Sequence, residues 1–331
     1  MTGTPRFGVL LTNLGSPTAP TPRAVRAYLR EFLADRRVVD LPRLRWWLIR
    51  HLFILPTRPR RSARLYRKIW TNEGSPLLAT TEKIGRGLVS DLTDTAGLLV
   101  PVEVGMRYGS PSIANGLRRL AAEGCRRVLI LPLFPQYSGT TTASAMDAVD
   151  EAVSNLETTP EIRTAPSYHD HPAYIDALAT SIRDIWNTTG SARRLLVSFH
   201  GIPKRYADVG DPYPIQCAAT TKALVKELDL PPGRWHLAYQ SRFGREPWLR
   251  PYLDERLQRW GQRGLSGIDV ICPGFAVDCL ETLEEVAMAG RRRFERAGGS
   301  AFRYIPALND SSEHLSALGQ IVTETAGGWL D

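Results

Sequence analysis

Short runs of apolar residues alternate with longer amphipathic stretches along most of this chain. Most of the short runs end in glycine, proline or a polar cluster, which is typical of buried strands. The longer stretches repeat apolar residues at helical spacing. We therefore predict strands over residues 7–14, 98–106, 127–134, 162–168, 194–199, 235–240, 268–272 and 302–307, and helices over 24–33, 144–156, 174–186 and 280–293.

Alternating strands and helices predict an α/β fold, in which parallel sheets carry helices on both faces. Ligands of such sheets bind beyond the carboxyl ends of the strands. The loops that follow the strands are therefore the first places to look for a functional site.

Two pairs of strand–loop segments resemble each other within the chain. GVLLTNLGSP at 8–17 is similar to LLVSFHGIP at 195–203, and ILPLFPQYSGTTT at 130–142 is similar to VICPGFAVDCLET at 270–282. Gly15 and Phe134 are 119 positions apart, whereas Gly201 and Phe275 are 74 apart. The pattern indicates two similar halves, the first with an insertion, although chance similarity of two strand–loop–helix units is the alternative.

Composition places the chain among globular proteins. Its 331 residues suggest about two domains, and 43% hydrophobic with 23% charged residues excludes disordered and collagen-like classes. Residues 1–6 lead directly into a strand-like run, and no secretory apolar stretch follows a basic region, so we expect no export signal. Four cysteines without a C-x-x-C pair favour a reducing cytoplasm over a disulfide framework or zinc ribbon.

The net charge of +8 comes from one segment. Residues 36–68 hold eleven basic residues and one acid, Asp40, so this segment carries +10 and the rest of the chain −2. A near-neutral body with one basic segment is unlike a protein that coats nucleic acid.

The basic segment begins with LPRLRWWLIRHLFILP at 41–56, which holds more apolar residues than one buried face needs. Pro42 and Pro56 bound it, and it is too short to cross a bilayer. It can be a core helix with a solvated basic flank, or an interfacial helix whose aromatic residues lie among lipid headgroups. Its apolar surface also suits the mouth of a pocket for an apolar acid. Nucleic-acid binding is least favoured, because the aromatic residues are not interleaved with the arginines.

Two loops hold the strongest candidates for chemistry. His200 lies where a buried strand ends, and an imidazole there can accept a proton, bind a metal or simply bond a loop carbonyl. In CPGFAVDCLETLEE, Asp278 is an acceptable N-cap, and Glu281 and Glu285 share one helical face. Capping alone explains Asp278 and Glu281. A carboxylate that faces an imidazole would instead bind Fe(II), or equally Zn(II).

Two further loops supply polar groups after predicted strands. Arg107 and Tyr108 lie in GMRYGSPS, and Tyr137 lies in FPQYSGTTT. Arg107 suits a carboxylate ligand, although helix capping explains either loop equally well. No G-x-G-x-x-G, Walker or G-x-S-x-G sequence is present, which disfavours a nucleotide cofactor and the usual serine hydrolase.

Taken together, these motifs resemble the ferrochelatase family, which inserts ferrous iron into a porphyrin in the last step of haem synthesis. The resemblance runs from Phe7 to about His314 and rests on NLGSP, GMRYG, FPQYS, SFHGIP, YQSRFG and CPGFAVDCLETLEE. It implies two Rossmann-like halves with the active cleft between them. Residues 1–150 would form the first, with residues 36–68 as a lip and a helix at 311–331 completing it. Residues 151–310 would form the second, carrying His200 and Glu281.

The resemblance also implies roles for single residues. His200 corresponds to the histidine that takes pyrrole protons or ligates iron, and Glu281 to its acidic partner, so the pair is both the catalytic and the metal site. Asp278 would orient Glu281. The residues that match the porphyrin-binding positions are Leu14, Arg107, Tyr108, Tyr137, Phe275 and Asp278, with Arg107 and the Arg60–Arg61 pair as candidates for the propionates.

The resemblance implies protoporphyrin IX and Fe(II) as substrates. Because no cysteine follows Cys279, we expect no [2Fe–2S] cluster and no other tightly bound cofactor. We expect a cytoplasmic enzyme that is peripheral to the inner membrane, with residues 41–55 on the membrane surface. The preceding oxidase of the haem pathway is a candidate partner, and nucleic acid is not.

Two alternatives remain at this point. The first is a chelatase for another tetrapyrrole, coproporphyrin III or sirohydrochlorin; Leu14, where some coproporphyrin-using members carry tyrosine, favours protoporphyrin. The second is a membrane-docked porphyrin or haem carrier without catalysis, which would need neither Glu281 nor Asp278.

Overall fold

A computed structural model describes residues 7–97, 99–192 and 194–330. Three predictions involve residues outside these ranges. They concern residues 1–6, where we expect no export signal, Leu98 in one predicted strand and Asp331 in the last predicted helix. The chain divides into two compact units. The first holds the described residues of Met1–Phe134, Ser138–Pro166 and Leu318–Asp331, and the second holds Pro135–Tyr137 and Ser167–Ala317.

The first unit is built on a four-stranded parallel sheet. Its strands are β1 (Gly8–Asn13), β2 (Val102–Met106), β3 (Arg127–Pro132) and β4 (Glu161–Thr164), in the order β2-β1-β3-β4. The predicted domain boundary at residue 150 falls inside a helix, and β4 pairs with β3, so the first unit continues past that boundary to Pro166.

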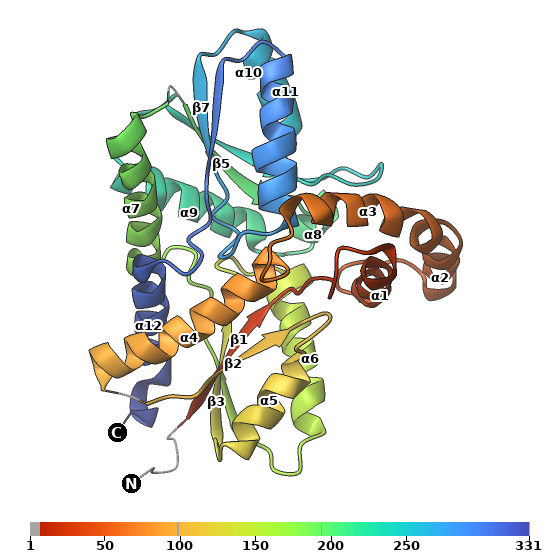
Figure 1. The fold of residues 1–331 in the computed structure, drawn as a ribbon, viewed down its shortest axis with the longest axis vertical. Helices are drawn as coiled ribbons and strands as arrows, with labels where there is room; N and C mark the ends of the chain where they lie inside the picture. The colour runs from red at the N-terminus through yellow and green to blue at the C-terminus, as the bar shows by residue number, and fades with distance from the viewer. Residues whose placement is uncertain (1–6, 98, 193, 331) are drawn as a thin grey trace. The chain divides into compact units, whose positions relative to one another are not determined.

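Helices cover both faces of this first sheet (Figure 1). On one face, α5 (Ile113–Ala122) and α6 (Ser144–Ser154) pack their apolar sides against β1 and β3 in a buried cluster that includes Leu10 and Ile130. On the other, α4 (Pro76–Ala96) packs against the sheet, with Gly85 beside Val104 and Leu11. The C-terminal helices are α12 (Ser312–Ala326) and the 3₁₀-helix η4 (Gly327–Trp329).

More than half of the segment between β1 and α4 is helical. It contains α1 (Pro22–Phe32), α2 (Arg43–Ile49), the π-helix η1 (Arg50–Ile54) and α3 (Leu55–Ile69), of which the last three follow one another without a break. The prediction that Pro56 ends the apolar helix is wrong. Pro56 lies in the first turn of α3, where a proline without an N–H donor is tolerated.

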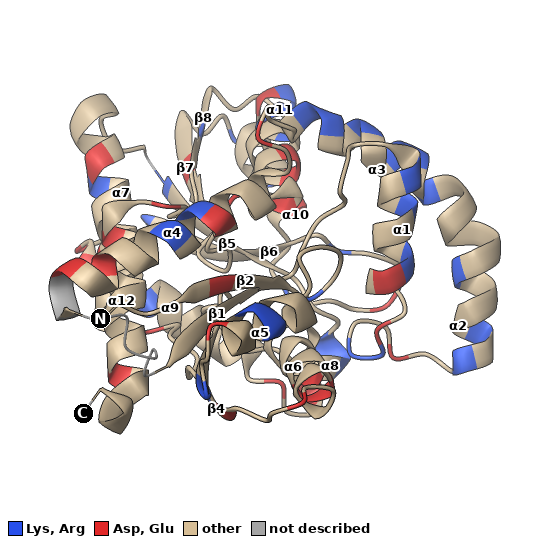
Figure 2. Cartoon of the chain, turned by 60° about the horizontal axis from the view of Figure 1, so that its bottom comes forward, with Lys and Arg blue, Asp and Glu red and all other residues tan. Residues whose placement is uncertain are grey.

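The interpretation of residues 41–56 as a core helix is also wrong over α2 and η1. Neither element holds a buried residue, and Leu44, Trp47 and Phe53 are 75%, 50% and 66% exposed. Basic residues repeat along the neighbouring α3 (Figure 2). Of the described helices, none has the length and apolar character that a membrane span requires.

The second unit repeats this architecture. Its parallel sheet has the order β6-β5-β7-β8, formed by β5 (Arg194–His200), β6 (Trp235–Gln240), β7 (Gly267–Ile271) and β8 (Ala301–Ile305). Its helices are α7 (Pro172–Thr189), α8 (Lys204–Asp208), α9 (Tyr213–Glu227), α10 (Leu253–Gln262) and α11 (Arg291–Arg296). Leu257, Trp260 and Phe294 of α10 and α11 form a core with β5, β6, β7 and β8.

The internal resemblance seen in the sequence is confirmed by the sheet topology. The similar segments begin with β1 and β5, which each pair with two neighbours, and with β3 and β7, which occupy the same place in the two sheets. A π-helix follows each of β3 and β7, namely η2 (Gly139–Ala143) and η3 (Glu281–Gly290). The α/β fold with two parallel, helix-flanked sheets is therefore confirmed, and all eight predicted strands correspond to β1–β8.

Candidate active site

His200 is the last residue of β5, where the buried strand gives way to a loop at the carboxyl edge of the sheet. Its ring is half-buried, and Nδ1 lies 2.6 Å from the carbonyl oxygen of Gly201. Because a carbonyl only accepts, Nδ1 carries the proton and donates it. Nε2 of the neutral ring is then left with a lone pair that can take a proton or bind a metal ion.

The close packing around Gly201 explains why a glycine directly follows His200. The N–H of Gly201 donates to the carbonyl of Gln240 at 2.8 Å, and a Cβ at Gly201 would lie 2.9 Å from that same oxygen and 3.2 Å from Cε3 of Trp248. A side chain here would push β5 away from β6. The glycine thus fixes the loop that orients His200.

Glu281 and Glu285 are one turn apart on the π-helix η3. The carbonyl of Glu281 accepts a hydrogen bond from Nε2 of Gln240 at 3.0 Å. The carboxylate of Glu285 accepts two from Ser241, at 2.8 Å from the backbone N–H and 2.5 Å from Oγ. Ser241 has a positive φ of 66°, which turns its N–H toward η3. The end of β6 therefore holds the first turn of the acidic helix.

The pKa of Glu285 depends on His200 as well as on residues of the helix itself. Burial raises the pKa of Glu285, while the hydrogen bonds from Ser241 and the charge on His200 lower it, and the charge on Glu281 raises it further. The net pKa lies above its ordinary value. Glu285 is thus the acidic residue of η3 that lies within electrostatic reach of both His200 and Glu281.

Asp278 does not cap the helix as predicted. The helical turn begins after it, and its carboxylate bonds side chains and not the first N–H groups of the helix. It accepts from Oγ1 of Thr282 at 2.7 Å, the hydroxyl of Tyr304 at 2.6 Å and Nδ2 of Asn309 at 2.9 Å. Its own N–H donates to Oδ1 of Asn309 at 2.9 Å. Asp278 therefore ties the β7–η3 loop to β8 and to the loop after it.

Aromatic side chains lie beside the imidazole in the second unit. The rings of Phe275 and Trp248 each have their centres 6.4 Å from that of His200. Tyr137 is exposed, and its backbone N–H donates to Oε1 of Gln216 at 2.6 Å. Aromatic faces at the carboxyl edge of a sheet suit a flat, apolar ligand.

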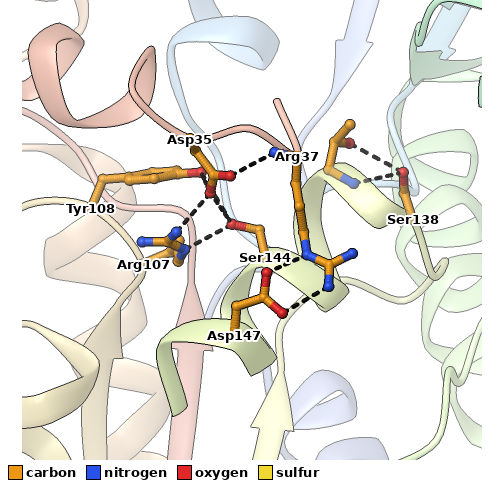
Figure 3. Close-up of polar contacts among 8 residues, drawn as sticks. Asp35, Arg37, Arg107, Tyr108, Ser138, Ser144 and Asp147 are labelled. Atoms are coloured by element: carbon orange, nitrogen blue, oxygen red, sulfur yellow. Dashed lines mark hydrogen bonds and ion pairs between the residues drawn. The ribbon is translucent and has the colours of Figure 1, made fainter. Parts of the chain in front are cut away.

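The other predicted residues belong to the first unit, where Arg107 and Tyr108 lie around Asp35 (Figure 3). Tyr108 is buried, and its hydroxyl donates to Oδ2 of Asp35 at 2.7 Å. Arg107 donates from Nη2 to the same oxygen at 2.7 Å and from Nε to Oγ of Ser144 at 2.7 Å. Leu14 is half-buried, and its carbonyl accepts from the N–H of Tyr108 at 3.0 Å.

The predicted residues thus form two groups. Leu14, Arg107 and Tyr108 belong to the first unit, whereas Tyr137, His200, Phe275, Asp278 and Glu281 belong to the second. Within the described ranges, no set of three or more His, Cys, Asp or Glu side chains is arranged to hold a metal ion.

Sequence reasoning missed four supporting residues: Asp35, Gln240, Ser241 and Asn309. Gln240 and Ser241 lie at the end of a predicted strand, a place where polar residues carry meaning in parallel sheets. Asn309 adopts a positive φ of 52°, and the Asn-Asp-Ser sequence before α12 was the available signal for a turn. Asp35 is separated by 72 and 73 residues from its partners Arg107 and Tyr108, and nothing local points to them.

Comparison with known proteins identifies the family. A model of the ferrochelatase family matches residues 6–326. The ferrochelatase of Nitrosococcus oceani is 52% identical over 326 residues, which is 98% of this chain and 88% of that protein. That of Thioalkalivibrio sulfidiphilus is 50% identical over 328 residues, 99% and 89% of the two chains.

A solved structure supports the fold. CbiX, described as the terminal enzyme for biosynthesis of siroheme in denitrifying bacteria, matches with a TM-score of 0.54 and 13% identity over 96% of this chain and 98% of its own. At that identity the likeness concerns the fold alone. Together with the matches above, it leads to one conclusion: the chain belongs to the ferrochelatase family, metal-inserting lyases that place ferrous iron in a porphyrin during haem synthesis.

Proposed function

We propose that this chain inserts Fe(II) into protoporphyrin IX, with His200 as the group that accepts a pyrrole proton or binds the incoming iron, and Glu281 as its carboxylate partner. The observation that carries this proposal is the orientation of His200. Its Nδ1–H is committed to the carbonyl of Gly201, so Nε2 is the basic atom, and Glu285 of η3, one turn from Glu281, lies within electrostatic reach.

The reaction explains why these groups are suited to the task. A free porphyrin is planar and carries two N–H protons in the hole that the metal must enter. Insertion requires that both protons leave and that iron exchanges its water for pyrrole nitrogens. An imidazole accepts protons near neutral pH, and a neighbouring carboxylate stabilises the imidazolium that results. Binding energy from the apolar periphery of the ring can contribute to distorting its centre.

We further propose that Leu14, Tyr137 and Phe275 touch the porphyrin. Phe275 lies next to His200, and Tyr137 exposes its ring. Arg107 and Tyr108 donate hydrogen bonds to Asp35, and Asp278 accepts hydrogen bonds from three donors. We propose that these three residues hold neighbouring loops in place and do not touch the porphyrin. A chelatase for another tetrapyrrole would insert iron faster into coproporphyrin III or sirohydrochlorin than into protoporphyrin IX. A carrier without catalysis would insert iron into none of the three. Comparing insertion into protoporphyrin IX, coproporphyrin III and sirohydrochlorin tests both.

The central experiment is anaerobic insertion of Fe(II) into protoporphyrin IX by His200→Ala. We expect porphyrin binding, measured by fluorescence quenching, to remain near the wild-type level while iron insertion falls by at least about 10²-fold, the contribution typical of a general base. His236→Ala, which removes a half-buried histidine of β6, serves as the matched control. Wild-type turnover by the His200 variant would remove the basis of this proposal.

We also propose that the enzyme is cytoplasmic and peripheral to the inner membrane, docking through residues 41–55. The exposed side chains of Leu44, Trp47 and Phe53 on α2 and η1, beside basic residues, support this. Apolar side chains with nearby arginines suit an anionic bilayer surface. The preceding oxidase of the pathway, itself a source of an apolar product, is the partner we expect at that surface.

Flotation with liposomes that contain anionic lipid tests the docking surface. Trp47→Glu with Phe53→Glu should abolish flotation, whereas Val209→Glu, at an even more exposed apolar residue of the second unit, should not. Equal flotation of both variants would contradict the proposal. We propose that the chain holds no iron–sulfur cluster, because its four cysteines, Cys125, Cys217, Cys272 and Cys279, are scattered along the sequence without a C-x-x-C pair. Purified protein should then lack the visible absorption of such a cluster.

A further inference from the structure

The loop between α1 and α2 contains a buried carboxylate that three other side chains converge on. The side chain of Asp35 is only 7% exposed. Its Oδ2 accepts from Arg107, Tyr108 and Ser144, the last at 2.5 Å, and its Oδ1 accepts from the N–H of Arg37 at 2.7 Å. The donors come from the β2–α5 loop, the start of α6 and the loop of Asp35 itself (Figure 3).

This carboxylate is ionised at neutral pH. Burial raises the pKa of Asp35, but the hydrogen bonds from Ser144, Tyr108 and the Arg37 backbone, together with the charge on Arg107, outweigh burial and leave the pKa below its ordinary value. The positive charge of Arg107 is correspondingly balanced inside the protein. A guanidinium already paired with a buried carboxylate gains less from a second carboxylate than a free one does.

Neighbouring contacts hold α1 against the loop between β2 and α5 of the same unit. The ring of Tyr108 meets those of Tyr28 and Phe32 edge to face, at 6.4 and 5.2 Å between centres. The N–H of Gly109 donates to Glu31 at 3.0 Å. Beyond Asp35, Arg37 forms a two-point ion pair with Asp147 of α6 (Figure 3).

Residues 36–68, the lip, are in turn attached to α1. Nε1 of Trp46 donates to the carbonyl of Leu33 at 2.6 Å, and Nη1 of Arg26 donates to that of Leu55 at 3.3 Å. The exposed apolar residues of α2 and η1 are therefore connected to the sheet through α1 and through the loop that holds Asp35. Loosening that loop would loosen the lip.

We propose that Asp35 is a positioning residue for porphyrin binding: it fixes the lip by holding Arg107 and Tyr108, and Arg107 thereby acts on the lip and not on a propionate of the substrate. This inference rests on the proposed function, and it takes residues 36–68 to border the bound porphyrin, as the family resemblance of the sequence implies. It assigns the conspicuous arginine of GMRYG to a partner 72 residues away in the sequence.

Kinetics of Asp35→Asn and Arg107→Gln test the assignment. Each variant should raise the KM for porphyrin about tenfold, the loss expected for one buried charge-assisted bond, with kcat within about twofold of wild type. The double variant should be no worse than either single variant, because both remove the same contact. Asp35→Glu should restore part of the affinity. Asp150→Asn, an exposed acid of α6, should match wild type.

A porphyrin diester separates this role from direct carboxylate recognition. If Arg107 holds the lip, both variants weaken binding of the free acid and of its dimethyl ester by the same factor. If Arg107 binds a propionate, Arg107→Gln weakens binding of the free acid alone, and Asp35→Asn leaves that binding intact or strengthens it. The second pattern would overturn the proposal.

Hydrogen exchange over residues 43–69 supplies a readout that does not depend on catalysis. Asp35→Asn should raise exchange in α2 and α3 and leave β5 and η3 unchanged, whether or not the protein inserts iron. Unchanged exchange in the lip would refute the positioning role, whereas a wild-type protein without insertion activity would refute only the proposed function. Ser144→Ala, a milder loss of one donor, should shift the same segments if Asp35→Asn folds poorly.

Discussion

Replacing Asp278 by asparagine tests whether this residue organises the active-site loop. Both Thr282 and Tyr304 donate to Oδ1, so an amide oxygen in that place can keep both bonds. The amide nitrogen then takes the place of Oδ2, 2.9 Å from Nδ2 of Asn309, and two donors face each other. The variant loses one charge-assisted bond and leaves a buried donor without an acceptor.

The cost follows from those two losses. A hydrogen bond to a charged group contributes about 1.5–3 kcal/mol and an unpaired buried donor costs about 1–3 kcal/mol, so we expect destabilisation of about 3 kcal/mol. For a unit of roughly 150 residues that corresponds to a melting temperature lower by about 6–12 °C. Because Glu281 follows three residues later, kcat for iron insertion should fall as well, while the affinity for porphyrin stays the same.

Calorimetric unfolding and anaerobic insertion assays measure both effects, with Asp310→Asn as the control. Asp310 is exposed and lies in the same loop as Asn309, so its substitution removes an equal charge without touching the bonds of Asp278. If the two variants melt at the same temperature, Asp278 is not an organiser of the loop. A change in porphyrin affinity at unchanged stability would instead place Asp278 against the substrate.

Two other residues of the second unit give separate predictions. Burial lowers the pKa of His314 to about 4, so the unfolded chain takes up a proton below about pH 6.5 that the folded chain refuses, and stability falls from pH 6.5 to 4 by about 3 kcal/mol in total. His314→Phe should flatten that part of the profile in denaturant titrations at several pH values, and an unchanged slope would disprove the assignment. Gly201→Ala should cost about 1–3 kcal/mol through overpacking against Gln240 and reduce insertion by about tenfold or more. Gly328→Ala, where an added Cβ meets nothing within 4 Å, should do neither, and equal melting points and rates would contradict the packing argument.

The sheets were predictable because their signal is local. Buried parallel strands are continuous apolar runs, and most of them here end in glycine, proline or polar residues. The same locality placed His200 at a strand end. The lip was harder, since a proline in the first turn of a helix and a proline that ends one look alike in sequence, and Pro56 is the first kind. Exposed apolar side chains on α2 likewise cannot be told from buried ones by composition.

The features that the sequence did not predict depend on contacts between residues far apart in the chain. The carboxylate of Asp278 satisfied a local capping rule, yet its partners Tyr304 and Asn309 lie 26 and 31 residues away. Arg107 resembled a free ligand for carboxylates until Asp35 was seen beside it. In both cases a short-range explanation existed, and only the folded chain shows which longer-range bond replaces it.

The repeated strand order gives every functional residue of the second unit a matching position in the first. Aligning Gly15 with Gly201 and Phe134 with Phe275 sets Leu14 opposite His200 and Thr140 opposite Glu281. The same strand arrangement thus occurs twice, with His200 and Glu281 in one unit and Leu14 and Thr140 at the matching positions of the other. Placing histidine at Leu14 and glutamate at Thr140 would therefore ask how much of metal insertion the backbone arrangement alone permits.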